Sequence, residues 1–198
     1  MSNYEKPDFW AVKARKEGYP ARSVYKLMEI DRKFRLLKQG ARILDIGAAP
    51  GSWSLWALRR LEGKGFVAAV DLRDLALDAA HGNFLFVRGD LYDPAVRSRL
   101  LAAGPFGLVL SDAAPATTGN RLVDQSASEG IVEAVMEYAE ASLAPGGALV
   151  AKIFQGGAEA ALLKRLRARF AQAKGFKPEA CRSESFETYL VATGFGRE

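Results

Sequence analysis

Cysteine and histidine are scarce in this 198-residue sequence, which has one cysteine, Cys181, and one histidine, His81. A lone cysteine excludes an internal disulfide, and one cysteine with one histidine excludes a dedicated His/Cys zinc cluster. We therefore expect a protein without a metal centre that works in a reducing compartment, the cytoplasm.

Long hydrophobic runs are missing as well. No stretch approaches the roughly 20 apolar residues that a membrane-spanning helix needs. The N-terminal MSNYEKPDFW lacks the basic-then-apolar layout of a signal peptide. Internal repeats, low-complexity tracts and long linkers are also absent. With 49% hydrophobic and 26% charged residues, the composition is that of a globular protein, and we expect one domain over residues 1–198.

The charge of the chain is unevenly distributed. Residues 1–42 hold 11 Lys and Arg against 5 Asp and Glu, residues 43–163 hold 9 against 14, and residues 164–198 hold 8 against 4. One basic run is often an ordinary solvated surface, but two in one small chain favour a polyanion partner. Nucleic acid and membrane phosphates both fit this pattern.

Short apolar runs alternate with amphipathic segments along most of the chain. The predicted strands are 41–46, 65–72, 83–90, 106–112 and 148–154, and the predicted helices between and after them are 52–61, 94–103, 125–143 and 158–170. Two β-like runs, 173–178 and 186–193, close the chain with little room for a helix between them. This alternation predicts an α/β, Rossmann-like fold with a doubly wound, mostly parallel seven-stranded sheet whose last strand is antiparallel.

A further helix is predicted in the basic segment, about residues 1–40, that precedes the first strand. Apolar side chains recur there at helical spacing, at Leu27, Ile30, Phe34 and Leu37. Lys26 lies at the margin of this stripe, from which its side chain can reach water. Farther along, Asp124 directly precedes the predicted helix 125–143 and is expected to cap it.

Ligands of doubly wound sheets bind at the carboxyl ends of the strands, near the point where the strand order reverses. The first predicted strand contains Asp45 and leads into a loop with Gly47 and Gly51, in the sequence DIGAAPGSW. Glycines let a ligand approach the backbone closely. The loop is neither the dinucleotide pattern G-x-G-x-x-G nor a Walker loop, so the ligand need not carry a phosphate.

Acidic residues end the next two predicted strands. Asp71 follows the glycine loop by about 20 residues, where a carboxylate suits a ribose diol. Asp90 ends the third strand and is placed to meet an adenine amino group. The loop and the two carboxylates together point to S-adenosylmethionine (AdoMet), a nucleoside without phosphate groups.

A lysine near the end of a predicted buried strand raises a further question. Lys152 lies in GGALVAKIFQGG, and lysine is almost never fully buried without a partner, because desolvating an ammonium is costly. Either this strand lies at the edge of the sheet with Lys152 in water, or a carboxylate lies beside it.

The chain resembles the FtsJ/RlmE family of RNA ribose 2′-O-methyltransferases over about residues 13–194. The matching motifs are ARSVYKL, LDIGAAPGSW, SDAAP, AKIFQG and KPEACRSESFETYLVATG. The resemblance implies a bacterial-type enzyme that uses AdoMet to methylate a uridine of 23S rRNA in the 50S subunit. It also implies a monomer that needs no metal and binds RNA and not a membrane.

The same resemblance implies a catalytic tetrad, which falls on Lys26, Asp112, Lys152 and Glu187. Lys152 is expected to have Asp112 and Glu187 as partners. It would either take the proton of the ribose hydroxyl or stay charged and orient that hydroxyl, and the sequence leaves both open.

The cofactor contacts implied by the resemblance are Gly51, Trp53, Asp71, Asp90 and Asp112, in addition to Asp45 and Gly47 of the glycine loop. The chain departs from the family pattern at three positions. Ser52 replaces the second glycine of the usual GAAPGGW, and Ala113 and Ala116 replace the usual Met and Asn after the fourth strand.

The basic ends of the chain are expected to contact RNA phosphates. The candidates are Lys13, Arg15, Lys16 and Arg22, together with the basic helix 158–170. Ribose methylation of tRNA is the nearest alternative. A non-catalytic RNA-binding assembly factor that retains AdoMet affinity is another, and a small-molecule O-methyltransferase is less well supported, because such enzymes usually need a metal or a lid.

Overall fold

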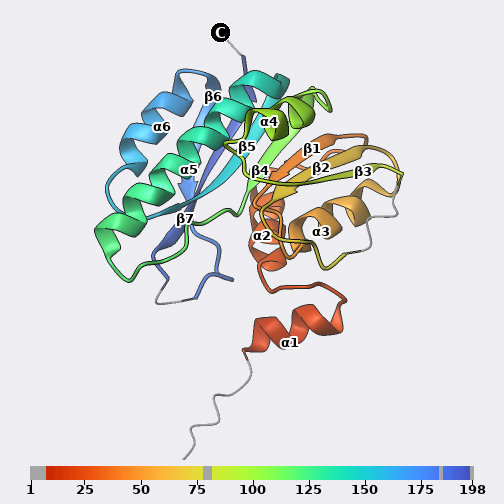
Figure 1. The fold of residues 1–198 in the computed structure, drawn as a ribbon, viewed down its shortest axis with the longest axis horizontal. Coiled ribbons are helices and arrows are strands. Elements are labelled where there is room, and N and C mark those ends of the chain that lie inside the picture. The colour runs from red at the N-terminus through yellow and green to blue at the C-terminus, as the bar shows by residue number, and fades with distance from the viewer. Residues whose placement is uncertain (1–7, 78–81, 183–184, 197–198) are drawn as a thin grey trace, which may run out of the picture.

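The computed structural model describes residues 8–77, 82–182 and 185–196, so His81 lies outside the described residues. A seven-stranded sheet of order β3-β2-β1-β4-β5-β7-β6 runs through the molecule (Figure 1). The strands are β1 (Arg42–Ile46), β2 (Phe66–Asp71), β3 (Phe84–Arg88), β4 (Phe106–Ser111), β5 (Leu143–Phe154), β6 (Phe170–Phe176) and β7 (Glu187–Phe195). The helices are α1 (Phe9–Lys16), α2 (Val24–Phe34), α3 (Ser52–Leu61), α4 (Pro94–Leu101), α5 (Arg121–Ser142) and α6 (Glu159–Arg167).

The strands of the sheet run in the predicted directions. Strands β1 to β5 pair in parallel, whereas β7 is antiparallel to both of its neighbours, β5 and β6. Among the described residues between β6 and β7 there is no helix, which fits an antiparallel pairing of these two strands. The Rossmann-like α/β fold and its antiparallel last strand are therefore confirmed.

Helices cover both faces of the sheet, and each face has its own hydrophobic core. Buried residues of α4, α5 and α6 pack on one face, and buried residues of α2 and α3 pack on the other. Because both faces are covered, β5 is buried almost throughout its second half. This strand is central, with β4 on one side and β7 on the other.

Several boundaries differ from the prediction. Strand β6, for example, begins at Phe170, where the predicted helix 158–170 was expected to end. The eight-residue helix α1 was not predicted; Asp8 caps it by accepting a hydrogen bond from the Trp10 backbone N–H. Helix α5 begins at Arg121 because Asn120 is its N-cap, so the prediction that Asp124 caps it is wrong. Asp124 instead lies inside the first turn and accepts hydrogen bonds from the backbone and hydroxyl of Thr118. Strand β5 also begins earlier than expected.

The packing of α1 places the chain's N-terminal region beside α2. Ala14 is buried, and the ring of Trp10 lies 4.9 Å from that of Tyr25 on α2. In Figure 1, α1 stands below α2 and α3, apart from the sheet. Across the described part of the chain, no helix is long and apolar enough to cross a bilayer.

Candidate active site at the carboxyl ends of the strands

The strand order reverses between β1 and β4, and a large cavity opens at this point. It has a volume of about 670 Å³ and is lined by the loops that follow β1, β2, β3 and β4. That volume falls in the range typical of small-molecule sites. The sheet topology thus places the cavity where the sequence predicted a ligand.

The glycine loop after β1 is held against its neighbours by close packing. Gly47 has φ +76°, and a Cβ there would lie 2.6 Å from Cα of Ala113. The backbone N–H groups of Gly47 and Ala48 donate to the carbonyl of Val70 on β2. Any side chain at position 47 would therefore strain the backbone and push the β4 loop away from the cavity.

Two predicted carboxylates line the cavity and are fixed by the backbone. Asp71 accepts hydrogen bonds of 2.9 Å from the N–H groups of Ala49 and Arg73. Asp90 accepts one of 3.0 Å from the N–H of Tyr92. Each carboxylate oxygen has room for a second donor, so the pair suits the hydroxyl and amino groups of a nucleoside.

Asp45 lies beneath the glycine loop and does not line the cavity. It is 1% exposed, and its Oδ2 accepts a 2.6 Å hydrogen bond from the Ser54 hydroxyl. Its Oδ1 has no partner among the described residues. Burial, reinforced by the nearby Asp112 and Asp71, raises the pKa of Asp45 to about 7, against the opposing effect of the Ser54 hydrogen bond.

Two further predicted cofactor residues, Gly51 and Trp53, also lie outside the cavity lining. A Cβ at Gly51, whose φ is +108°, would lie 2.6 Å from Cδ2 of Leu77. Trp53 is buried; its ring lies 5.9 Å from that of Tyr189, and its indole N–H donates to the carbonyl of Ser23. Gly51 and Trp53 therefore support the glycine loop by packing and hydrogen bonding on its side away from the cavity.

Lys152 lies two residues before the end of β5, with a carboxylate beside it. Its Nζ lies 3.0 Å from Oδ1 of Asp112 and donates to the Asp112 carbonyl at 2.6 Å. The Lys152 side chain is 9% exposed and that of Asp112 17%. Because β5 is central, the lysine is not an edge residue in water, and Asp112 supplies the compensating charge.

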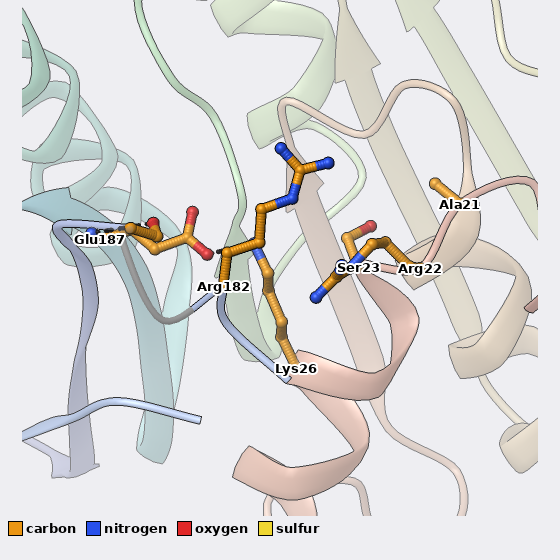
Figure 2. A pocket seen from close by; sticks show the side chains of 7 residues that line it. Ala21, Arg22, Ser23, Lys26, Arg182 and Glu187 are labelled. Carbon is orange, nitrogen blue, oxygen red and sulfur yellow. Dashed lines mark hydrogen bonds and ion pairs between the residues drawn. The ribbon is translucent and has the colours of Figure 1, made fainter. Parts of the chain in front are cut away.

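Lys26 and Glu187 form a second pair, 2.5 Å apart, with both side chains 13% exposed. Both residues line a second, smaller cavity of about 430 Å³, together with Arg22 and Arg182 (Figure 2). Lys26 points from α2 toward Glu187 on β7, so it does not extend into water as the helix pattern suggested. Glu187 is thus the partner of Lys26, and Asp112 is the partner of Lys152.

The two pairs line two neighbouring cavities. Lys152 and Asp112 line the larger cavity, Lys26 and Glu187 line the smaller one, and Ser23 lines both. A ligand in the larger cavity would therefore lie beside Lys152 and a ligand in the smaller one beside Lys26, with Ser23 next to both.

Tyr189 and Cys181 support the pairs, although sequence reasoning did not identify them. The buried Tyr189 hydroxyl donates to Oδ1 of Asp112 at 2.7 Å, and burial is the main cause of its raised pKa. The Cys181 thiol has a pKa raised to about 12, mainly by burial and then by its hydrogen bond to Glu187. Tyr189 could have been found from its spacing, since it lies two residues after Glu187 on the same strand face.

The predicted RNA-binding residues have different environments. Arg22 pairs with Asp8 and donates to the Ala180 carbonyl. Lys13 lies 4.8 Å from the Tyr25 ring centre and 3.9 Å from Glu17. Arg15 and Lys16 are exposed on α1.

The basic residues around α6 have carboxylate partners. Arg165 pairs with Glu133, and Arg169 lies 3.7 Å from Glu140. Both acids belong to α5, so this basic run is partly neutralised within the fold.

The three departures from the family pattern lie close to the site. Ala113 and Ala116 line the larger cavity, where small side chains leave space. Ser52 is 1% exposed, and its hydroxyl accepts a 2.7 Å hydrogen bond from the Ala21 backbone N–H.

The sheet order, with a nucleoside-sized cavity after β1, is that of a Rossmann-like α/β fold. The fold resembles that of human methyltransferase-like protein 13 in complex with SAH, with a TM-score of 0.61 and 14% identity over 88% of this chain and 83% of that one. More specifically, the chain belongs to the FtsJ-like methyltransferase family, whose model matches residues 19–195.

Relatives match over nearly the whole chain. A protein of Treponema denticola named ribosomal RNA large subunit methyltransferase E is 48% identical over 98% of both chains. The protein of that name from Borrelia duttonii is 46% identical over 96% of this chain and 97% of its own length. A ribosomal RNA methyltransferase structure from Plasmodium falciparum has a TM-score of 0.78 and 28% identity over 89% of this chain and 98% of that one.

Proposed function

We propose that this protein transfers a methyl group from AdoMet to the 2′-hydroxyl of a ribose in large-subunit ribosomal RNA, a uridine of 23S rRNA within the 50S particle, in the cytoplasm. The observation that carries the proposal is the placement of two lysine–carboxylate pairs between a nucleoside-sized cavity and a basic one. RNA offers a 2′-hydroxyl and DNA does not. The names of the relatives support the large subunit as the source of that RNA.

The larger cavity would hold AdoMet, which supplies a methyl group already activated by its positive sulfur. Asp71 would accept hydrogen bonds from the ribose diol, and Asp90 would accept one from the adenine amino group. Gly47 keeps the backbone open to the ligand, and Asp112 lies where the methyl-bearing end is expected. Gly51, Trp53 and Asp45 would contribute by shaping the loop.

The smaller cavity would hold the target ribose. The hydroxyl would have to be aligned and to lose its proton as its oxygen bonds to the methyl carbon, while the bond from that carbon to sulfur breaks and S-adenosylhomocysteine leaves. Lys152 is the proposed acceptor of that proton; it would have to be the neutral amine at that step, with its lone pair directed at the hydroxyl. The residue lines the cofactor cavity and its Nζ is held by Asp112. Lys26 and Glu187 would position the ribose, and their opposite charges leave the pair neutral beside the reacting groups.

RNA phosphates would bind to the basic surface that surrounds the smaller cavity. Arg22 and Arg182 line that cavity, and Arg182 points across it in Figure 2. Arg15 and Lys16 extend the surface along α1, with Lys13 beside them. Contacts of this kind fix the position of the RNA without reading its sequence.

The proposal is tested by offering labelled AdoMet to 50S particles, to free ribosomal RNA and to tRNA, then mapping the methylated nucleotide by mass spectrometry. We expect one 2′-O-methyluridine in the large-subunit RNA, formed best on the particle. Transfer to tRNA alone would contradict the proposed substrate. A protein that binds AdoMet but transfers no methyl to any RNA would be a binding factor and not an enzyme.

A further inference from the structure

The segment that leads from β6 into β7 carries two residues of the smaller cavity, Arg182 and Ser185. Arg182 is exposed and lines the same cavity as Lys26 (Figure 2). It belongs to neither a helix nor a strand. Its position at the cavity therefore depends on how this segment is attached to the rest of the fold.

Helix α2 and the residues just before it hold the segment at Ala180. Glu29 on α2 uses both carboxylate oxygens: Oε2 accepts a 2.7 Å hydrogen bond from the backbone N–H of Glu179, and Oε1 accepts one of 2.9 Å from that of Ala180. The Ala180 carbonyl in turn accepts a 2.6 Å hydrogen bond from the guanidinium of Arg22. Ala180 is fully buried, so its N–H and its carbonyl are both fixed by side chains from this region.

Glu29 and Lys26 are three residues apart on α2, so they lie on the same face of the helix. Lys26 pairs with Glu187 at the start of β7. The two side chains thus hold Ala180 and Glu187, which lie on either side of Arg182 in the sequence. Arg182 follows Ala180 by only two residues, and a displacement of Ala180 would therefore move it.

We propose that Glu29 is a positioning residue that sets Arg182 at the RNA cavity, where the guanidinium would contact a phosphate of the bound RNA. This inference rests on the proposed function, because it assigns the smaller cavity to RNA. Glu29 itself lines neither of the two cavities. A carboxylate suits the role, since its two oxygens accept both backbone N–H groups at once, whereas an amide has only one oxygen to offer.

The sign of the effect separates this role from simple electrostatics. Glu29 carries a negative charge near a site for phosphates, and its removal should by charge alone strengthen RNA binding. Loss of the anchor should instead weaken binding, because Arg182 would no longer be held where a phosphate lies. Weaker binding after the removal of a carboxylate is therefore the result that indicates positioning.

The test measures the affinity for 50S particles, with S-adenosylhomocysteine present, of wild type, Glu29→Gln and Glu29→Ala. The glutamine variant keeps the shape of the side chain and one acceptor, so it remains informative if the alanine variant does not fold. We expect particle affinity to fall about 3- to 10-fold and the salt slope of log affinity to decrease by about one, as for the loss of one phosphate contact.

The cofactor side should not respond to these changes. Affinity for S-adenosylhomocysteine alone should stay within about twofold of wild type, because Glu29 lies outside the larger cavity. At steady state, KM for the particles should rise, while kcat at saturating particles and KM for AdoMet stay close to the wild-type values.

Asp31→Ala is the matched control. Asp31 lies on the same helix, carries the same charge and also accepts hydrogen bonds from two backbone N–H groups, those of Leu36 and Leu37. Both leucines follow the C-terminal end of α2, and neither lines the smaller cavity. We expect this variant to melt at a lower temperature than wild type without weaker particle binding. An equal loss of particle affinity in Asp31→Ala and Glu29→Ala would overturn the proposal.

A double-mutant cycle with Arg182→Ala tests whether Glu29 acts through Arg182. If it does, Glu29→Gln should weaken particle binding in the wild-type background and have little further effect once Arg182 is replaced. Additive losses, or an unchanged affinity and salt slope in both Glu29 variants, would overturn the inference even where the wild type methylates 50S particles normally. A wild type that neither binds nor methylates any RNA would instead overturn the proposed function, and this inference with it.

Discussion

Lys152 is paired within the core through a single neighbouring residue. Asp112 supplies both a carboxylate oxygen and its own carbonyl to the ammonium, and Tyr189 donates to the same carboxylate oxygen. The two contacts with Asp112 leave one direction for a substrate hydroxyl. In the neutral amine that direction is the lone pair that accepts a proton, and in the ammonium it is a third N–H that can only orient the hydroxyl. The group is oriented before the substrate binds.

Replacing Lys152 by arginine separates its two possible roles. Arginine keeps the positive charge but cannot act as a base near neutral pH. If Lys152 takes the proton, Lys152→Arg should lower single-turnover methyl transfer at least about 100-fold, the usual contribution of a general base. A variant that kept transfer within about tenfold would show that the charge alone is sufficient and would contradict the proton-acceptor role.

Asp45 should make stability depend on pH. Its pKa is about 7 in the folded chain against an ordinary value of 3.8, so the folded state holds a proton that the unfolded state has released. The free energy of unfolding should therefore fall as pH rises from about 4 to about 7, by up to about 1 kcal/mol per pH unit. Urea unfolding of wild type and Asp45→Asn over this range measures the effect, since the asparagine cannot ionise. A pH dependence equal in both proteins would exclude Asp45 as its source.

At the scale of elements, the pattern of residues predicted most of the sheet and helix order. Period-2 and period-3.6 patterns place long elements well, because burial enforces them. Helix α1 was missed because it has only two turns and two of its apolar residues, Phe9 and Val12, are exposed. The N-cap of α5 was misplaced because the helix begins four residues before its apolar pattern is evident.

The tetrad shows which features of an active site can be predicted from a sequence. Family resemblance named all four residues, and the structure brings them together. The sequence assigned both carboxylates to Lys152, whereas Glu187 pairs with Lys26, because the pairing depends on the register of β7 against β5. Lys152 lies opposite Tyr189 and Phe154 lies opposite Glu187, which leaves Glu187 within reach of Lys26 on α2.

Helix α1 should contribute to RNA binding through its exposed cations. Replacing both Arg15 and Lys16 by alanine should weaken binding of 50S particles and reduce the salt slope of log affinity by about one for each phosphate that is no longer neutralised. Replacing Arg165 and Arg169 removes the same charge near α6, where both are paired with α5. The first double variant should change the slope and the second should not. The opposite result would place RNA along α6.

At the scale of the whole molecule, two cavities lie along one edge of the sheet, one lined by acidic residues and the other by basic ones. The loops after β1 to β4 build the acidic cavity, and α2 with the segment before β7 builds the basic one. The basic N-terminal region and the acidic middle of the sequence thus meet at a boundary that carries the two lysine–carboxylate pairs. Reaction is expected at that boundary and not in either cavity alone.

The most direct measurement of this account compares wild type and Lys152→Ala on the same 50S particles with labelled AdoMet. The wild type should place one methyl group on a ribose 2′-oxygen of the large-subunit RNA. Lys152→Ala should place none within the same time, while its affinity for S-adenosylhomocysteine stays within about twofold, because cofactor binding is assigned to Asp71 and Asp90. Near-normal ribose methylation by Lys152→Ala would contradict the assignment of the active site.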